Sequence, residues 1–555
     1  MNRLRSNPWI ILLVLCMGFF MILLDTTIVN IAIPSIIDSL NATLDEVLWV
    51  LNAYILVYAV LLITFGRLGD ILGQRTMFAA GMVVFVVASA FSGQAQNSTQ
   101  LIAARMAQGI GGAMLTPQTL AMLTTVFPPH RRGAAFGVWG AVAGLATVAG
   151  PTLGGLIVTT WGWRWIFYIN LPIGVLALVA TFLLIPDIHP GRRHRLDLVG
   201  VGLASLGLFL IVFGLIEGEH FDWGTVWRFV TVPMVIAAGV VTLAAFVVWE
   251  TRQAEPLVPL SLFRNRNYTL MNGVSMVVAF AMLGFYLPLT IYLQSVLAFS
   301  PLEAGLAIAP MAVAAMLVSP FSGRLADHIG GKYILMAGLL LYATGMGIVA
   351  FSASPSTPWS ALLAPLMVAG CGQGCVFAPM NAVAMRHITP GMAGAASGVI
   401  NTTRQLGGAI GSSVVGAVLQ NQLVFHLREQ ALAHAGELPP QVRQSFVDGF
   451  SNAVKAGFEV GPSQNGGLPV PVGLPPQLVQ QLNQVAHEVF AGAFVAAMKP
   501  TLAIPLAVVV IGALSCLAVR GDKQAREPAT APEEPRAQAG RRAAAHSPHQ
   551  GRSLP

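Results

Sequence analysis

One carboxylate, that of Asp25, is set apart from the other acidic residues because it lies well inside a long apolar run. The sequence contains 23 Asp and Glu residues, and the other 22 fall in connections, in the C-terminal tail or at the ends of apolar runs. Asp25 follows Trp9 by sixteen residues, or roughly 24 Å along a helix. A charge at this depth in a membrane is costly, so we expect it to face the protein interior or a water-filled cavity, where it can bind and release protons.

A structural role is the alternative for Asp25, with its carboxylate capping a broken helix before Pro34. If the protein is a transporter and Asp25 carries its protons, the proton and the transported substrate must share or compete for a single membrane carboxylate. This favours a low proton count and lipophilic substrates that are neutral or carry one positive charge, because multiply charged cations require a second acid within the membrane.

Other polar, aromatic or soft residues within apolar runs are candidate contacts for a small lipophilic substrate. For most of them, packing against a neighbouring helix is the alternative. The candidates for the substrate cavity are Asn30, Tyr54, Tyr292, Gln294, Met380, Asn381 and Arg404.

Composition excludes a water-soluble protein. Hydrophobic residues make up 55% of the 555 residues and charged residues only 10%, whereas soluble domains carry about 25% charged residues. The excess apolar surface must therefore face lipid. The net charge of +7 is spread over short clusters between apolar runs, which fits membrane topology and does not indicate nucleic-acid binding.

No catalytic or metal-binding pattern accompanies these features. Cys371 and Cys375 lie one helical turn apart, but no His or acidic residue completes a metal site. The phosphate-binding loop of ATP-driven pumps is also missing. We therefore expect no enzymatic activity, no cofactor and no metal; transport would be driven by a proton gradient.

Apolar runs of about 18 residues or more predict fourteen membrane-spanning helices. Basic residues are concentrated in alternate connections, which places both termini in the cytoplasm and the multi-pass chain in the cytoplasmic (inner) membrane. The predicted spans are 9–33, 47–66, 76–96, 99–125, 134–158, 163–185, 196–217, 229–250, 269–297, 302–324, 332–352, 358–384, 393–421 and 493–519.

An eight-residue turn is repeated in the two halves of the chain: Gly66–Gly73 recurs as Gly323–Gly330. Two related halves are typical of secondary transporters with a substrate site between them. An acidic residue, glycines and neighbouring basic residues in a tight turn could form a charge latch that differs between conformations; a plain tight loop is the alternative. The latch candidates are Gly66, Arg67, Asp70, Gly73, Arg75, Arg324 and Asp327.

Small residues recur in the fifth predicted span, and Pro151 introduces a kink there. Gly150, Gly154 and Gly155 allow another helix to approach closely. Generic packing of small residues in membranes is the alternative. The two can coincide, because a close interface between the two halves of the protein could be where they rock against each other and close.

Taken in order, several motifs resemble those of the major facilitator superfamily, in particular its fourteen-helix drug:proton antiporter group (EmrB/QacA type). Leu24–Pro34 resembles the first-helix motif, and the repeated turn resembles the cytoplasmic-loop motif. Arg105 falls where the fourth-helix motif has its arginine. Gly150–Gly155 resembles the fifth-helix motif associated with antiporters, and Trp163–Pro172 is similar to the sixth helix.

The resemblance implies an all-α membrane fold with two six-helix bundles, residues 1–190 and 266–520, joined by two extra helices within 191–265. It also implies alternating access, a part for Arg105 in proton coupling, and multidrug efflux by a protein that works as a monomer. For Arg105, a structural role in which it bonds backbone carbonyls at a bend is the alternative. An exporter of a metabolite, antibiotic or lipid, or a proton-coupled importer, is the alternative. We expect an extracytoplasmic insertion at 422–492, either a helical hairpin or a flexible loop, and a disordered tail at 521–555.

Overall fold

The computed structural model describes residues 7–186, 195–218, 220–440, 443–444, 446–447 and 476–520. Almost all of these residues are helical, apart from a short antiparallel hairpin of β1 (Thr225–Trp227) and β2 (Val230–Thr231). The tail predicted to be disordered, residues 521–555, lies outside the described part of the chain.

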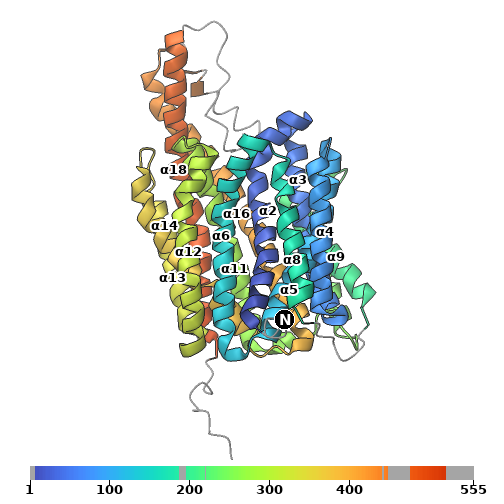
Figure 1. Cartoon of the computed structure of the whole chain (residues 1–555). Coiled ribbons are helices and arrows are strands. Elements are labelled where there is room, and N and C mark those ends of the chain that lie inside the picture. Colours follow the sequence, from blue (N-terminus) through green and yellow to red (C-terminus); the bar gives the residue numbers. More distant parts are fainter. Residues whose placement is uncertain are drawn as a thin grey trace, which may run out of the picture. The chain divides into compact units, whose positions relative to one another are not determined.

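The first bundle consists of six membrane helices, the last of which is interrupted (Figure 1). Polar caps begin several of them: Asn7 caps α2, Thr43 and Glu46 form a capping box on α3, and Asn97 caps α5. The helices are α2 (Pro8–Leu40), α3 (Leu44–Leu72), α4 (Gln74–Gln94), α5 (Ser98–Val126), α6 (Arg132–Trp161), and α7 (Trp165–Tyr168) with α8 (Asn170–Leu184).

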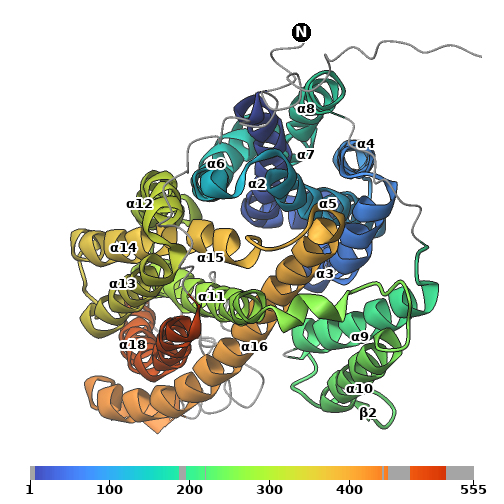
Figure 2. The ribbon, with the colours of Figure 1, turned by 90° about the horizontal axis from the view of Figure 1, so that it is seen from below.

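The second bundle repeats this plan after an intervening helix pair, α9 (Leu198–Glu217) and α10 (Val232–Glu250). In Figure 2 this pair lies to one side, next to α3 and α16. The bundle contains α11 (Arg266–Ile291) with a π-helical turn (Tyr292–Val296), α12 (Pro301–Ile329), α13 (Gly331–Ser352), α14 (Trp359–Gly374) with α15 (Phe377–Ala384), α16 (Ala393–His434) and α18 (Pro476–Ser515).

Thirteen helical segments among the described residues are long and apolar enough to cross a membrane. The remaining predicted span is α5, whose hydropathy is lowered by polar residues such as Arg105, Gln108 and Gln118. These three side chains are buried, because α5 packs against α3 and α4 inside the first bundle. The polar residues that lower the mean hydropathy of α5 therefore face the interior of the protein and not the lipid.

The two bundles meet mainly along two helix pairs, α6 with α12 and α3 with α16. Both pairs join one helix from each half of the chain. The functional residues predicted from the sequence lie along these pairs or on the helices next to them.

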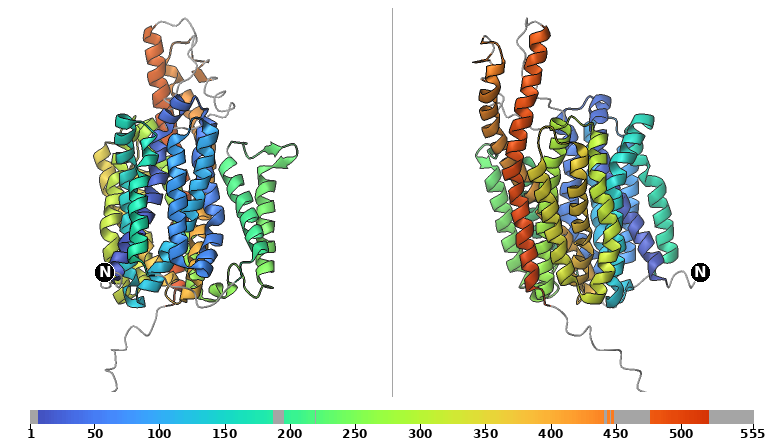
Figure 3. Two further views of the ribbon diagram at one scale, coloured as in Figure 1. Left: turned by 45° about the vertical axis from the view of Figure 1, so that its right-hand side comes forward. Right: turned by 90° about the vertical axis from the view of Figure 1, so that its left-hand side faces the viewer.

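The connection predicted at 422–492 begins and ends as helix. The α16 helix is 42 residues long and extends to His434, and the 40-residue α18 starts at Pro476. Their projecting ends, seen in Figure 3, pack through Leu427, Val485 and Phe490. The described ends of this insertion thus have the hairpin arrangement, while 441–442, 445 and 448–475 lie outside the described residues.

Candidate functional site

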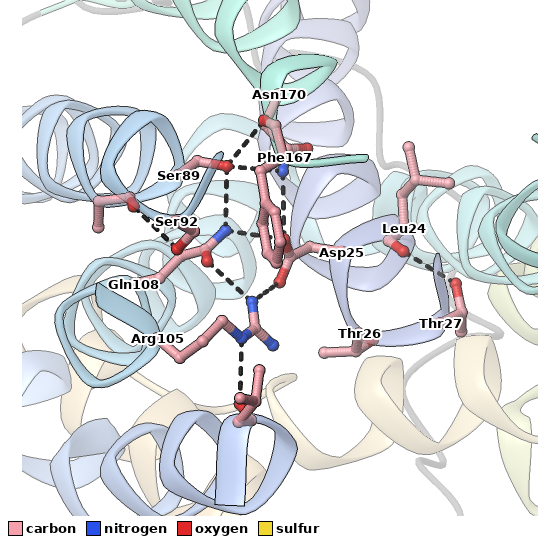
Figure 4. A network of polar contacts seen from close by, with 12 residues as sticks. Leu24, Asp25, Thr26, Thr27, Ser89, Ser92, Arg105, Gln108, Phe167 and Asn170 are labelled. Carbon is pink, nitrogen blue, oxygen red and sulfur yellow. Dashed lines mark hydrogen bonds and ion pairs between the residues drawn. The ribbon is translucent and has the colours of Figure 1, made fainter. Parts of the chain in front are cut away.

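The Asp25 carboxylate is completely buried and is bonded on both oxygens by side chains (Figure 4). Arg105 Nη1 forms an ion pair with Oδ2. Gln108 Nε2 donates to Oδ1 over 2.7 Å, and Asn170 Nδ2 donates to the same oxygen over 3.1 Å. The acid predicted to be the proton carrier and the arginine predicted to tune it are therefore in direct contact.

A second layer of contacts fixes these partners. Ser89 Oγ accepts from Asn170 over 3.1 Å and donates to the Phe167 carbonyl over 2.9 Å. Arg105 Nε donates to the Val50 carbonyl over 3.3 Å, and its guanidinium lies 4.3 Å from the centre of the Tyr54 ring. The network draws on α2, α3, α4, α5, α7 and α8, so a change at the carboxylate affects most of the first bundle.

The alternative of a backbone cap at a helix break is not what the structure contains at Asp25. Helix α2 continues through Pro34 to Leu40, and the side chains of Arg105, Gln108 and Asn170 donate the hydrogen bonds described above to the carboxylate. A buried carboxylate next to a guanidinium and two amides has two protonation states with different bonding. The charged state keeps the ion pair, whereas the protonated state loses it and gains a hydrogen-bond donor.

Gln108, Asn170 and Ser89 were not among the predicted site residues. Gln108 follows Arg105 by three residues and therefore lies on the same helix face. Asn170 is a fully buried amide at the start of α8. Buried amides inside apolar spans were the available signal, since such groups need partners that the surrounding lipid cannot supply.

The repeated turn places its two acids at the helix N-termini of the opposite bundle. Asp70 accepts from the backbone N–H groups of Gly394 and Ala395 over 2.7 and 2.8 Å, at the start of α16. Asp327 accepts from Gly133 and Ala134 over 2.8 Å each, at the start of α6. A carboxylate is stabilised at this end of a helix by the exposed N–H groups and the helix dipole.

Glycines make this close contact possible. A side chain at Gly66 would run into the Gly394 backbone, and one at Gly323 would run into the Gly133 backbone. Gly73 and Gly330, which end the two turns, adopt φ angles of 97° and 89° that favour glycine. The receiving segments are also repeated, since Gly133–Val138 and Gly394–Val399 share Gly-Ala-Ala-x-Gly-Val, a repeat that our sequence analysis missed.

The basic residues of the turn are arranged less symmetrically. Arg67 is buried, Arg324 is exposed, and Arg75 donates to the Phe182 carbonyl of its own bundle over 3.0 Å. Instead, the unpredicted Arg132 crosses to the other bundle. Its Nη1 donates to the carbonyl oxygens of Met385 and Arg386 over 3.0 and 3.3 Å.

The glycine motif of the fifth span lies between two helices. A side chain at Gly150 would meet Thr27 of α2, and one at Gly154 would meet Ile28. Pro151 packs close to Gly305 of α12, whereas Gly155 has more room. Helix α6 therefore joins the Asp25-bearing helix to the other bundle.

The candidate substrate residues do not form one cluster. Asn30 is exposed, Gln294 is partly exposed, and Met380 and Asn381 are buried. Tyr292 donates to the Ser354 carbonyl over 2.7 Å. Two open apolar grooves, one between α13 and α18 and one between α12 and α14, contain none of the candidates in their linings.

Comparisons with known proteins agree with this architecture. The Major Facilitator Superfamily model matches residues 15–412. The chain is 34% identical to the tetracenomycin C resistance and export protein of Streptomyces glaucescens, covering 76% of this chain and 78% of that protein. It is 37% identical to the multidrug resistance protein Stp of Mycobacterium tuberculosis, covering 73% and 74%. The human organic anion transporter MFSD10 has a similar fold, with a TM-score of 0.56 at 15% identity over 82% of this chain and 99% of that one.

Proposed function

Because the chain belongs to the Major Facilitator Superfamily, we propose that it exports lipophilic, drug-like compounds in exchange for protons. Relatives at 34% and 37% identity that are named for drug resistance and export support the substrate class. The observation that carries the proton coupling is the buried Asp25–Arg105 pair, whose carboxylate lies well inside a predicted span.

Protonation of Asp25 removes the ion pair with Arg105 and loosens the tie between α2 and α5. Helix α2 packs on α6 where Thr27 and Ile28 meet Gly150 and Gly154. Helix α6 in turn begins at the Asp327 contact and runs along α12. Proton binding is therefore linked mechanically to the interface between the bundles.

The contacts of Asp70 and Asp327 hold the two bundles together at one face, which corresponds to one state of an alternating-access cycle. We assign this face to the cytoplasmic side of the inner membrane, with both termini on that side, because basic residues gather in the same connections. Release of the two acids from the opposing helices opens the cavity to the cytoplasm. The protein acts as a monomer in this scheme.

The test is uptake of ethidium into liposomes that contain the purified protein, driven by an imposed proton gradient. We expect Asp25→Asn to lose uphill transport by at least tenfold while still exchanging dye down its own gradient. Asp38→Asn, which changes an exposed acid of the same helix, serves as the matched control and is expected to behave as wild type.

An Asp25→Asn variant that concentrates ethidium as well as wild type places the coupling group elsewhere. Wild-type protein that moves no dye under any gradient contradicts drug export. Movement in the direction of the proton flux, instead of against it, identifies an importer.

A further inference from the structure

The two bundles differ in how their membrane-embedded cations are neutralised. Arg105 of the first bundle is paired with Asp25. In the second bundle, Arg404 Nη2 donates to a neutral group, the Asn401 Oδ1 atom, over 2.7 Å. Among the residues that the structure describes, no carboxylate forms an ion pair with Arg404. A guanidinium stays protonated in proteins, so Arg404 is a positive charge without a counter-charge.

Arg404 lies at mid-depth and at the boundary between the bundles. It follows Gly394, the residue held by Asp70, by ten residues of helix, which corresponds to about 15 Å from the latch face. Its side chain interacts with Tyr58 of α3, which belongs to the other bundle. The residue as a whole is only partly buried.

Within the described part of the chain, the surroundings of Arg404 offer hydrogen bonds but no negative charge. Asn401 and Asn272 are neutral amides, and Thr403 Oγ1 donates to Asn272 Oδ1 over 3.4 Å. Tyr58 Oη donates to Thr116 Oγ1 over 3.1 Å. A cation within the membrane is costly unless it is paired. A negatively charged group of a bound molecule can supply the missing partner.

Two tyrosines join this position to the proton site. The Tyr58 ring stacks on the Tyr54 ring, with 5.9 Å between their centres and 7° between their planes. Tyr54 in turn carries the guanidinium of Arg105 over its ring at 4.3 Å. An anion at Arg404 is therefore separated from the Asp25–Arg105 pair by two stacked rings, so the two sites can influence each other without sharing a ligand.

We propose that Arg404 is the anion-binding group of the substrate cavity and that the transported compounds include lipophilic acids, with a carboxylate, phenolate or enolate bound by the guanidinium. This inference rests on the proposed transport function and names its substrate class. Counting acids in the sequence favours neutral or monocationic substrates. The structure adds that the one mid-span acid, Asp25, is already paired, whereas the cation opposite it is not.

The test compares binding of two dyes with the same xanthene skeleton, anionic fluorescein and cationic rhodamine 6G, to the purified full-length protein at pH 8 by fluorescence anisotropy, without any proton gradient. We expect R404Q to raise the Kd of fluorescein at least tenfold, equivalent to about 1.4 kcal/mol, and R404K to raise it less. Both variants should bind rhodamine 6G within about twofold of wild type, which also reports that they are folded.

A second measurement needs no variant: 2-naphthoate and 2-naphthamide, which differ in charge, compete for bound fluorescein on wild-type protein. We expect naphthoate to compete at least tenfold better. Equal competition, wild-type protein that does not bind fluorescein, or R404Q that weakens both dyes equally overturns the assignment. Because binding is measured without a gradient, loss of coupling in Asp25→Asn leaves this result unaffected, and the two proposals fail separately.

Discussion

The Asp25 carboxylate accepts bonds from two amides and one guanidinium, each on a different residue of the first bundle. A network of this kind stabilises a buried charge only while every member is satisfied, because the low dielectric that strengthens its bonds also makes a missing bond expensive. Gln108 is the most connected of the amides. It contacts Asp25, Arg105 and Ser89 with its two terminal atoms.

We expect Gln108→Met to test this dependence, because methionine has nearly the same shape and no hydrogen-bonding amide. Loss of the bonds to Asp25 and Arg105 should cost about 1–3 kcal/mol. The measurement is a lower melting temperature of the purified protein together with weaker proton-driven ethidium uptake. Gln100→Met, at an exposed position of the same helix, should change both only slightly. Equal melting temperatures of the two variants would show that the network contributes little to stability.

At the scale of elements, the contact between the bundles depends on helix segments whose backbones meet at glycine residues. The start of α16 meets α3 at Gly394 and Gly66, and the start of α6 meets α12 at Gly133 and Gly323. Each acid of the turn then bonds two N–H groups that a helix leaves unpaired.

Gly394→Ala places a methyl group against the Gly66 backbone and the Asp70 carboxylate. We expect it to shift the population toward states open at the latch face, since even about 1–2 kcal/mol changes such an equilibrium several-fold or more. Spin-label distances between α3 and α16 at this face measure the shift. Gly391→Ala, only three residues away and in open space, is the matched control. A distance distribution that is the same in both variants contradicts a latch.

The sequence predicted the long helices of the described residues and the acids of the turn because these features have strong local signals: long apolar runs and an eight-residue repeat. It did not identify what the acids bind, because Gly394 is 324 residues from Asp70 and only folding brings them together. The amide partners of Asp25 were missed for the same reason. The continuation of α16 to His434 reflects the pairing of its projecting end with α18.

At the scale of the whole molecule, the twofold repeat is incomplete, and one departure from it lies at the contact between the bundles. Aligning Gly133–Val138 with Gly394–Val399 places Arg132 opposite Ala393. Arg132 Nε donates to the Phe127 carbonyl of its own bundle over 3.1 Å. Its Nη1 donates to the carbonyl oxygens of Met385 and Arg386 in the other bundle. One of the two interfaces therefore has an additional clamp that the other lacks.

We expect Arg132→Ala, which makes this helix start like that of α16, to weaken closure of the latch face without abolishing it, because both Asp contacts remain. The lost charge-assisted bonds to carbonyl oxygens are worth about 1.5–3 kcal/mol. Spin labels on α6 and α12 should report a larger open fraction, and labels on α3 and α16 a smaller change in the same direction. Arg131→Ala alters the exposed neighbouring arginine and should leave both distances as in wild type. If Arg132→Ala opens neither interface, the clamp is dispensable and the paired acids alone close this face.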